Sequence, residues 1–218
     1  MREQKQAYRV KEAFYTLQGE GVNSGRPAVF CRFEGCNLWS GLERDRDVAV
    51  CQFCDTDFVG TDGSGGGLFA SAQALASAIS DLWPTDLRPE RRPLVVLTGG
   101  EPALQVDEAL VQALHAEGFE VAMETNGTLP VPTGIDCLTV SPKAGARLVV
   151  TGGTELKLVF PQDGIDPSRL SGLQFAHFFL SPKDSPEREQ ATRLALDFCL
   201  ANPPWRLSIQ THKILGIR

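Results

Sequence analysis

The fold is decided by residues 93–127, PLVVLTGGEPALQVDEALVQALHAEGFEVAMETNG. Residues 93–102 are an apolar run of strand length that ends in two glycines, and residues 119–127 are a second such run that ends in a polar turn. Between them, residues 103–118 carry apolar side chains at helical spacing and stop at Gly118. A strand, a helix and a strand in this order predict two parallel neighbours in one sheet.

The same alternation continues on both sides of this unit. Helical spacing predicts helices at 71–83 and 186–201, and short apolar runs predict further strands at 27–33, 136–142, 154–160, 176–182 and 206–210. We therefore expect about seven strands, mostly parallel and wrapped by helices, which is fewer than the eight of a closed barrel. The predicted fold class is α/β, an incomplete or modified TIM-like (β/α) barrel. In such barrels the active site lies at the carboxyl ends of the strands, where this chain has TGGEP, ETNG, SPK and SPKD.

Composition favours a single domain over residues 1–218. With 218 residues, 42% of them hydrophobic, the chain can bury one sizeable core. The net charge of −6 argues against bulk nucleic-acid binding, but a local basic pocket could still hold a small anionic substrate. The glycine-rich stretch at 59–69 is expected to be a flexible connector.

The cysteines bear on the compartment and on the chemistry. The N-terminus has no apolar segment typical of a secretion signal, and no apolar run approaches the roughly 20 residues that span a bilayer. We therefore expect a cytoplasmic protein without membrane contact, in which thiols stay reduced. The six cysteines then indicate metal ligands or core residues before disulfides.

Three of the cysteines lie on one polar loop, residues 34–57, in the pattern C-x14-C-x2-C. Two thiolates separated by two residues can bind one metal centre, and a third thiolate completes three ligands to a four-iron cube. The fourth iron would stay open for the amino and carboxylate groups of S-adenosylmethionine. The predicted cluster ligands are Cys36, Cys51 and Cys54.

A structural zinc site is the alternative that the cysteines alone leave open. Adding Cys31 gives C-x4-C-x14-C-x2-C, a passable spacing for a four-thiolate zinc site. Position favours the cluster, because Cys31 lies inside the apolar run 27–33 and points opposite to Arg32, where a free cysteine is usually a small core residue. Cys137 and Cys199 also lie in apolar contexts and are expected in the core.

The cysteine loop resembles that of radical S-adenosylmethionine enzymes, whose usual spacing is C-x3-C-x2-C, with eleven extra residues before the second cysteine. The resemblance continues along the chain in YTLQGEG (15–21), VFCRFEGCNL (29–38), CDT (54–56), TGGEP (98–102), ETNG (124–127), SPK (141–143), ELK (155–157) and IQTHKILGIR (209–218). Any one of these motifs is weak. Together, and in this order, they resemble the 7-carboxy-7-deazaguanine synthase family.

The resemblance implies a carbon–nitrogen lyase of queuosine and 7-deazapurine biosynthesis. In that reaction, reductive cleavage of S-adenosylmethionine at a [4Fe-4S] cluster gives a 5′-deoxyadenosyl radical, which abstracts hydrogen from 6-carboxy-5,6,7,8-tetrahydropterin. Ring contraction with loss of ammonia then gives 7-carboxy-7-deazaguanine. The family also implies Mg²⁺, a reduced flavodoxin or ferredoxin as electron donor, and a homodimer.

The resemblance also implies contacts to S-adenosylmethionine from several strand ends. Paired glycines let a backbone approach a ligand closely, and hydroxyl and amide groups suit ribose and carboxylate oxygens. The implied residues are Gly99, Gly100, Glu101, Thr125, Asn126, Ser141, Pro142, Lys143, Ser181, Pro182, Lys183 and Asp184.

For the pterin, the resemblance implies a second group of side chains. An amide beside a carboxylate suits a pterin edge, and a planar guanidinium suits the substrate carboxylate. The implied residues are Leu17, Gln18, Gly19, Glu20, Arg32, Thr98 and Arg218. Thr56 is the Mg²⁺ candidate, and His212 is the only histidine near the implied site. No side chain is assigned a catalytic role, because the cofactor carries the radical chemistry.

Two other functions stay open at this point. One is a non-catalytic zinc-binding domain that uses Cys31, Cys36, Cys51 and Cys54. The other is a radical S-adenosylmethionine enzyme with another substrate, such as an activase for glycyl-radical proteins. Iron and sulfide content distinguishes the first from a radical enzyme, and product analysis distinguishes the second.

Overall fold

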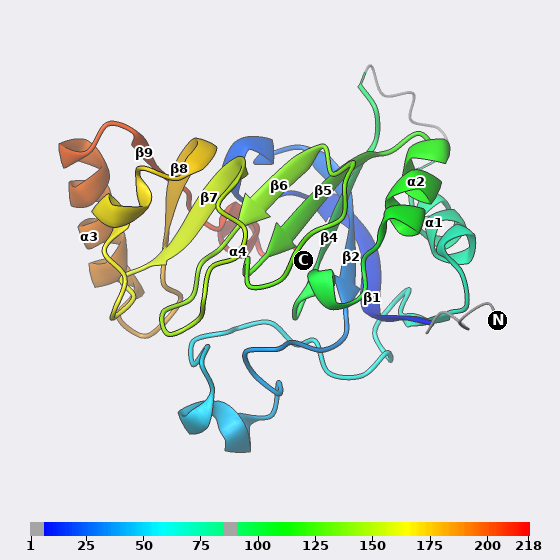
Figure 1. The fold of residues 1–218 in the computed structure, drawn as a ribbon, viewed down its shortest axis with the longest axis horizontal. Coiled ribbons are helices and arrows are strands. Elements are labelled where there is room, and N and C mark those ends of the chain that lie inside the picture. The colour runs from blue at the N-terminus through cyan, green and yellow to red at the C-terminus, as the bar shows by residue number, and fades with distance from the viewer. Residues whose placement is uncertain (1–6, 85–90) are drawn as a thin grey trace.

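The computed structural model describes residues 7–84 and 91–218, which form an open nine-stranded sheet in the order β3-β1-β2-β4-β5-β6-β7-β8-β9 (Figure 1). The run from β2 to β9 is parallel throughout. Its strands are β2 (Pro27–Phe33), β4 (Leu94–Gly99), β5 (Glu120–Thr125), β6 (Cys137–Val140), β7 (Gly152–Phe160), β8 (Gln174–Pro182) and β9 (Trp205–Leu207). These are the strands that the sequence predicts, and the open parallel sheet confirms the incomplete barrel. No helix in the described part of the chain is long and apolar enough to cross a membrane.

Two antiparallel strands at one edge were not predicted. β1 (Tyr8–Leu17) pairs with β2, and β3 (Gly67–Phe69) pairs with β1. β3 is the end of the stretch 59–69, which the sequence predicts as a connector without a strand. Hydrogen bonds hold the rest of this stretch along β1, since the Gly63 amide donates to the Lys11 carbonyl at 2.9 Å. The glycines permit this approach, because a Cβ at Gly66 would lie 2.2 Å from the same carbonyl oxygen.

Helices cover the outer face of the sheet. α1 (Ala72–Ser80) and α2 (Glu108–Ala116) lie over the β1–β5 end, and α3 (Arg188–Ala201) lies at the β8–β9 end (Figure 1). The single helix predicted over 103–118 is divided, because the Asp107 side chain accepts the Leu110 amide and starts a new helix. The remaining helices are η1 (Gly21–Asn23), η2 (Glu43–Val48), η3 (Pro102–Leu104), η4 (Pro167–Leu170) and α4 (Thr211–Leu215).

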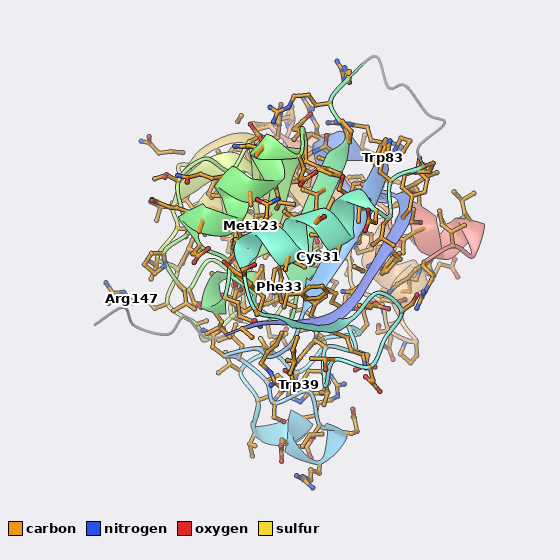
Figure 2. The ribbon with its side chains drawn as sticks, turned by 90° about the vertical axis from the view of Figure 1, so that its right-hand side faces the viewer. Cys31, Phe33, Trp39, Trp83, Met123 and Arg147 are labelled. Carbon is orange, nitrogen blue, oxygen red and sulfur yellow. The ribbon has the colours of Figure 1, made fainter. Side chains whose placement is uncertain are left out.

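The pleat of the strands sorts side chains between two environments. Val29, Cys31 and Phe33 of β2 face outward into the core beneath α1 and α2, where Figure 2 shows Cys31, Phe33 and Met123. The alternate positions of each strand face the concave side of the half-barrel. There, Leu94 and Val96 of β4 belong to a small apolar floor with parts of β2, β5 and β6. Above this floor the inward positions become polar.

Candidate active site

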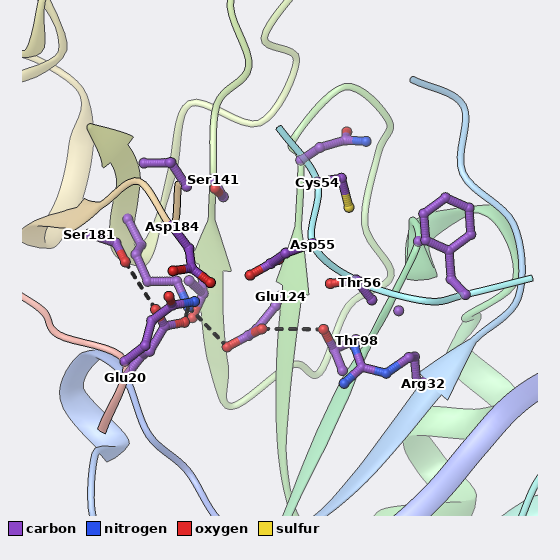
Figure 3. Close-up of a pocket in the computed structure, with 18 of the residues that line it drawn as sticks. Glu20, Arg32, Cys54, Asp55, Thr56, Thr98, Glu124, Ser141, Ser181 and Asp184 are labelled. Carbon is purple, nitrogen blue, oxygen red and sulfur yellow. Dashed lines mark hydrogen bonds and ion pairs between the residues drawn. The ribbon is translucent and has the colours of Figure 1, made fainter. Parts of the chain in front are cut away.

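A cavity of about 400 Å³ lies at the carboxyl ends of the parallel strands. Strand-end side chains such as Thr98, Glu124 and Ser141 form its wall, next to Cys54, Asp55 and Thr56 of the cysteine loop 34–57 (Figure 3). Residues near the end of the chain also line it. Six carboxylates and six Lys or Arg side chains line it. The lining is therefore balanced in charge: it lacks the acidic excess of the whole chain, but it is not the basic pocket that an anionic substrate was expected to need.

All three predicted cluster ligands line this cavity. Cys51 donates a hydrogen bond to Cys54, which lowers the pKa of the Cys54 thiol to about 6. Burial is the main cause that raises the pKa of Cys36, and the charge of Cys54 contributes to the same shift. The Cys36 sulfur also accepts the Leu38 amide at 3.4 Å. Within 7–84 and 91–218, no three His, Cys, Asp or Glu side chains are already grouped closely enough to hold a metal ion.

Cys31 does not line the cavity. Its side chain is fully buried on the outer face of β2, and burial raises the pKa of its thiol. This placement confirms the core prediction for Cys31 and separates it from the other three thiols. Cys137 is likewise buried in the apolar floor, and Cys199 packs partly buried against the core beneath α3. The structure therefore does not assemble the four-thiolate site of the zinc alternative.

The residues implied for S-adenosylmethionine meet on one side of the cavity. Those that line it are Gly99, Gly100, Thr125, Asn126, Ser141, Lys143, Ser181, Pro182, Lys183 and Asp184. Gly100 also has a role within the fold, because a Cβ there would lie 2.1 Å from the Gly35 carbonyl oxygen. The paired glycines thus let the cysteine loop cross the end of β4. Lys143 is held at this side by two 2.7 Å hydrogen bonds to Ser141.

Glu101 is not among the residues that line the cavity and lies behind its wall. Its carboxylate is fully buried and accepts the Thr125 hydroxyl and the Asn126 amide, both at 2.7 Å, and the Ala103 amide at 2.9 Å. Burial raises the pKa of this carboxyl, although these hydrogen bonds act in the opposite direction. Glu101 therefore holds the ETNG turn against the end of β4.

Replacing Glu101 is expected to affect stability directly. In Glu101→Ala, two buried donors and one partly buried donor lose their acceptor, and we expect the free energy of unfolding to fall by about 3 kcal/mol. Urea unfolding measures the change, with Glu108→Ala as the control for a solvent-exposed glutamate. Equal effects of the two substitutions would contradict this role for Glu101.

Two further implied residues lie outside the cavity. Pro142 is buried, and its carbonyl accepts the Gln162 amide at 3.3 Å. Gly19 lines a smaller neighbouring cavity, where a Cβ would lie 2.2 Å from Nδ1 of His212. Gly19 thus makes room for the histidine. His212 itself lines the main cavity, and burial lowers its pKa.

A buried polar network fills the substrate side of the cavity. Lys157 Nζ lies 2.6 Å from a Glu20 oxygen and 3.2 Å from a Glu124 oxygen. Glu124 also accepts the Gln18 amide and the Thr98 hydroxyl, each at 3.2 Å. Gln18, Glu20 and Thr98 were predicted as site residues. Glu124 and Lys157 were not predicted as site residues, although they lie within the ETNG and ELK motifs.

Glu124 and Lys157 each stabilise the charged form of the other. Burial raises the pKa of Glu124, but the Lys157 charge and the hydrogen bonds outweigh burial, so the pKa is lowered overall. Burial lowers the pKa of Lys157, but the charges of Glu124 and Glu20 outweigh it and raise the pKa. One ammonium between two carboxylates leaves a net negative charge. Such a site favours ligands with several N–H donors.

Arg32 and Arg218 lie at the far side of the cavity. Both contact Glu12, a residue that was not predicted: Arg32 Nε lies 2.9 Å from one carboxylate oxygen and Arg218 Nη2 lies 3.0 Å from the other. Leu17 and Thr56 also line the cavity. Lys213 of α4 forms ion pairs with Asp55 and Asp184, and so ties the end of the chain to the cysteine loop and to the end of β8.

An open parallel half-barrel with three cysteines on a loop over its carboxyl-terminal face defines the radical S-adenosylmethionine class of enzyme. No protein-family model matches the chain. Curated 7-carboxy-7-deazaguanine synthases do: those of Bordetella pertussis (61% identical, 97% of this chain and 99% of the relative), Burkholderia multivorans (60%, 96% and 99%) and Caulobacter vibrioides (59%, 96% and 99%). The crystal structure of QueE from Escherichia coli superposes with a TM-score of 0.69 at 30% identity, covering 94% of both chains. The chain belongs to the 7-carboxy-7-deazaguanine synthase family. This membership decides against the zinc-binding domain and the radical enzyme with another substrate.

Proposed function

We propose that the chain converts 6-carboxy-5,6,7,8-tetrahydropterin to 7-carboxy-7-deazaguanine with loss of ammonia, using a [4Fe-4S] cluster, S-adenosylmethionine and Mg²⁺ in the cavity at the strand ends. Family membership gives the product and its place in 7-deazapurine biosynthesis. The observation that carries the assignment of the cavity is that three loop thiols and the buried Lys157 network line the same space. We also infer a single domain over 1–218.

The donor set fits a cluster with one open iron. Cys36, Cys51 and Cys54 offer three sulfurs at one cavity, and three thiolates are the ligand number that leaves one iron of a four-iron cube open. When bound, the cluster would supply the electron that cleaves S-adenosylmethionine. The nearby Lys143, whose pKa is lowered chiefly by burial, can hold a carboxylate at this side of the cavity.

S-adenosylmethionine is placed along the strand ends next to the cysteines. Thr125, Asn126 and Ser141 supply hydroxyl and amide groups there, and Ser181 to Asp184 supply more at the end of β8. Gly99 and Gly100 have no side chains, so they leave space in the cavity wall between the cysteine loop and the ETNG turn. Glu101 supports the turn from behind through Thr125 and Asn126, and it stays among the residues proposed for S-adenosylmethionine.

The pterin is placed against Gln18, Glu20, Thr98, Glu124 and Lys157. The guanidine-like edge of a pterin carries several N–H donors, and two carboxylates with an amide oxygen can accept them. Because these side chains already bond to one another, their orientation is fixed before the ligand arrives, which lowers the entropy lost on binding. Arg32 is then left to hold the substrate carboxylate.

Thr56 is the protein ligand proposed for Mg²⁺. Mg²⁺ keeps several waters and takes few protein ligands, so one hydroxyl and the substrate carboxylate are enough to complete its coordination with water. Asp55 and Asp57 line the cavity beside Thr56 and add negative charge around the ion. The remaining implied partners are also proposals: a reduced flavodoxin or ferredoxin as electron donor, a second copy of the chain in a homodimer, and a cytoplasmic location.

The test is a product assay on anaerobically reconstituted protein. With reductant, S-adenosylmethionine and 6-carboxy-5,6,7,8-tetrahydropterin, we expect 7-carboxy-7-deazaguanine and ammonia, with no accumulation of 5′-deoxyadenosine because S-adenosylmethionine is regenerated. Chelation of Mg²⁺ should slow product formation, and Thr56→Ala should remove most of this Mg²⁺ dependence. An intact cluster without product would contradict the substrate assignment.

A further inference from the structure

Among the described residues, Glu12 is the carboxylate at the arginine side of the cavity that contacts two guanidinium groups. Its oxygens separately contact Arg32 Nε at 2.9 Å and Arg218 Nη2 at 3.0 Å. The Glu12 side chain is 15% exposed and the Arg32 side chain 20%, so both are largely shielded from water. Charge-assisted hydrogen bonds of this kind fix a guanidinium more firmly than contacts at the open surface do.

The same face of β1 holds Arg218 at three successive positions. Glu12, Phe14 and Thr16 alternate along the strand and so point to one side of it. The Arg218 guanidinium lies 4.9 Å from the centre of the Phe14 ring, and the Thr16 hydroxyl donates to the Arg218 carbonyl at 2.8 Å. The Phe14 ring is itself fixed by stacking on Phe30 at 5.9 Å. Three contacts from β1 therefore hold Arg218 at the edge of the cavity.

The geometry leaves the end of Arg32 available. Glu12 takes Nε, and in the described part of the chain neither terminal Nη atom of Arg32 has a hydrogen-bond partner. Figure 3 shows Arg32 beside Thr98 on the wall of the pocket. A carboxylate can bind both Nη atoms end-on without displacing Glu12.

We propose that Glu12 is a positioning residue that holds Arg32 and Arg218 in place for the carboxylate of the substrate. This inference rests on the proposed function, in which Arg32 binds that carboxylate. Without Glu12, Arg32 keeps its charge but loses its fixed orientation, so part of the binding free energy goes into ordering the side chain. Glu12 therefore sets the preference for a carboxylated pterin and has no part in the radical step.

Equilibrium dialysis against the cluster-loaded full chain tests this, with 6-carboxypterin and pterin as probes. Wild type should prefer 6-carboxypterin. Glu12→Ala should weaken 6-carboxypterin about tenfold and leave pterin unchanged, while Arg218→Ala should give a smaller loss. In turnover, Glu12→Ala should raise the substrate KM and leave kcat within about twofold. This is the pattern expected when a lost contact is equally strong in the bound substrate and in the transition state.

Controls separate this inference from the substrate assignment and from misfolding. Glu189→Ala, which removes an exposed carboxylate paired with Arg193, should change neither affinity. Glu12→Gln keeps the shape and serves if Glu12→Ala does not fold. Tighter 6-carboxypterin binding by Glu12→Gln would overturn the inference, because Glu12 would then compete with the ligand. If Arg32→Ala keeps the preference for 6-carboxypterin, the substrate assignment fails; if only the Glu12 variants keep it, this inference alone fails.

Discussion

Cys36→Ala, Cys51→Ala and Cys54→Ala are each expected to leave a protein that cannot retain a [4Fe-4S] cluster. A [4Fe-4S] cluster with one open iron needs all three thiolates. No other cysteine in the described residues lines the cavity to replace a lost ligand. After anaerobic reconstitution, iron and sulfide should fall from roughly four of each per chain to near background, with loss of the broad visible absorbance. Product formation should fall by at least about 10³-fold, since the radical chemistry needs the cluster.

Cys31→Ala is the matched control for these variants. Its thiol lies on the opposite face of β2, fully buried beneath α1 and α2. We expect normal iron content and activity, with a loss of about 1 kcal/mol in the free energy of unfolding from the small cavity. A cluster lost in Cys31→Ala but retained in one of the loop variants would contradict the ligand assignment.

The strand alternation in the sequence predicted much of the site. Arg32 and Cys31 are neighbours in an apolar run. Because successive side chains of a strand point to opposite faces, the sequence predicted Arg32 at the cavity and Cys31 in the core. The structure confirms both positions. The same alternation places Thr98 above the apolar floor made by Leu94 and Val96. The strand ends and the residues that face the cavity can therefore be predicted from the sequence alone.

Other features depend on contacts that sequence order does not reveal. β1 escaped prediction because Lys11 and Glu12 interrupt its apolar pattern, and its pairing with β2 and β3 supplies the stability that the pattern lacks. A motif names Glu101 but does not show that its oxygens are already taken by the ETNG turn. Glu124 and Lys157 meet only through the register of β5, β6 and β7.

Glu124→Gln is expected to remove most of the activity while keeping the cluster. The substitution keeps the size of the side chain but removes one of the two carboxylates around Lys157 and an acceptor proposed for the pterin edge. We expect kcat to fall by about 10²-fold or more, as loss of an aligned polar group in a reaction cavity does. Iron content should be unchanged, and 5′-deoxyadenosine should accumulate, because S-adenosylmethionine is still cleaved over a misaligned substrate. Glu120→Gln is the control on the same strand, where the carboxylate pairs with Arg26 away from the cavity.

The pH dependence of stability separates this role from a general loss of packing. Because the pKa of Glu124 is lowered from the usual 4.5, its ionised form adds stability at neutral pH, and that part is lost as the pH falls from the usual value through the lower folded value. Glu124→Gln should therefore show a shallower acid limb in urea unfolding measured across this range. Lys157→Met should instead lose roughly 3–5 kcal/mol at pH 7, since two buried carboxylates would face each other without a cation. Activity in Glu124→Gln equal to that of Glu120→Gln would show that the carboxylate only balances Lys157 and makes no contact that the reaction needs.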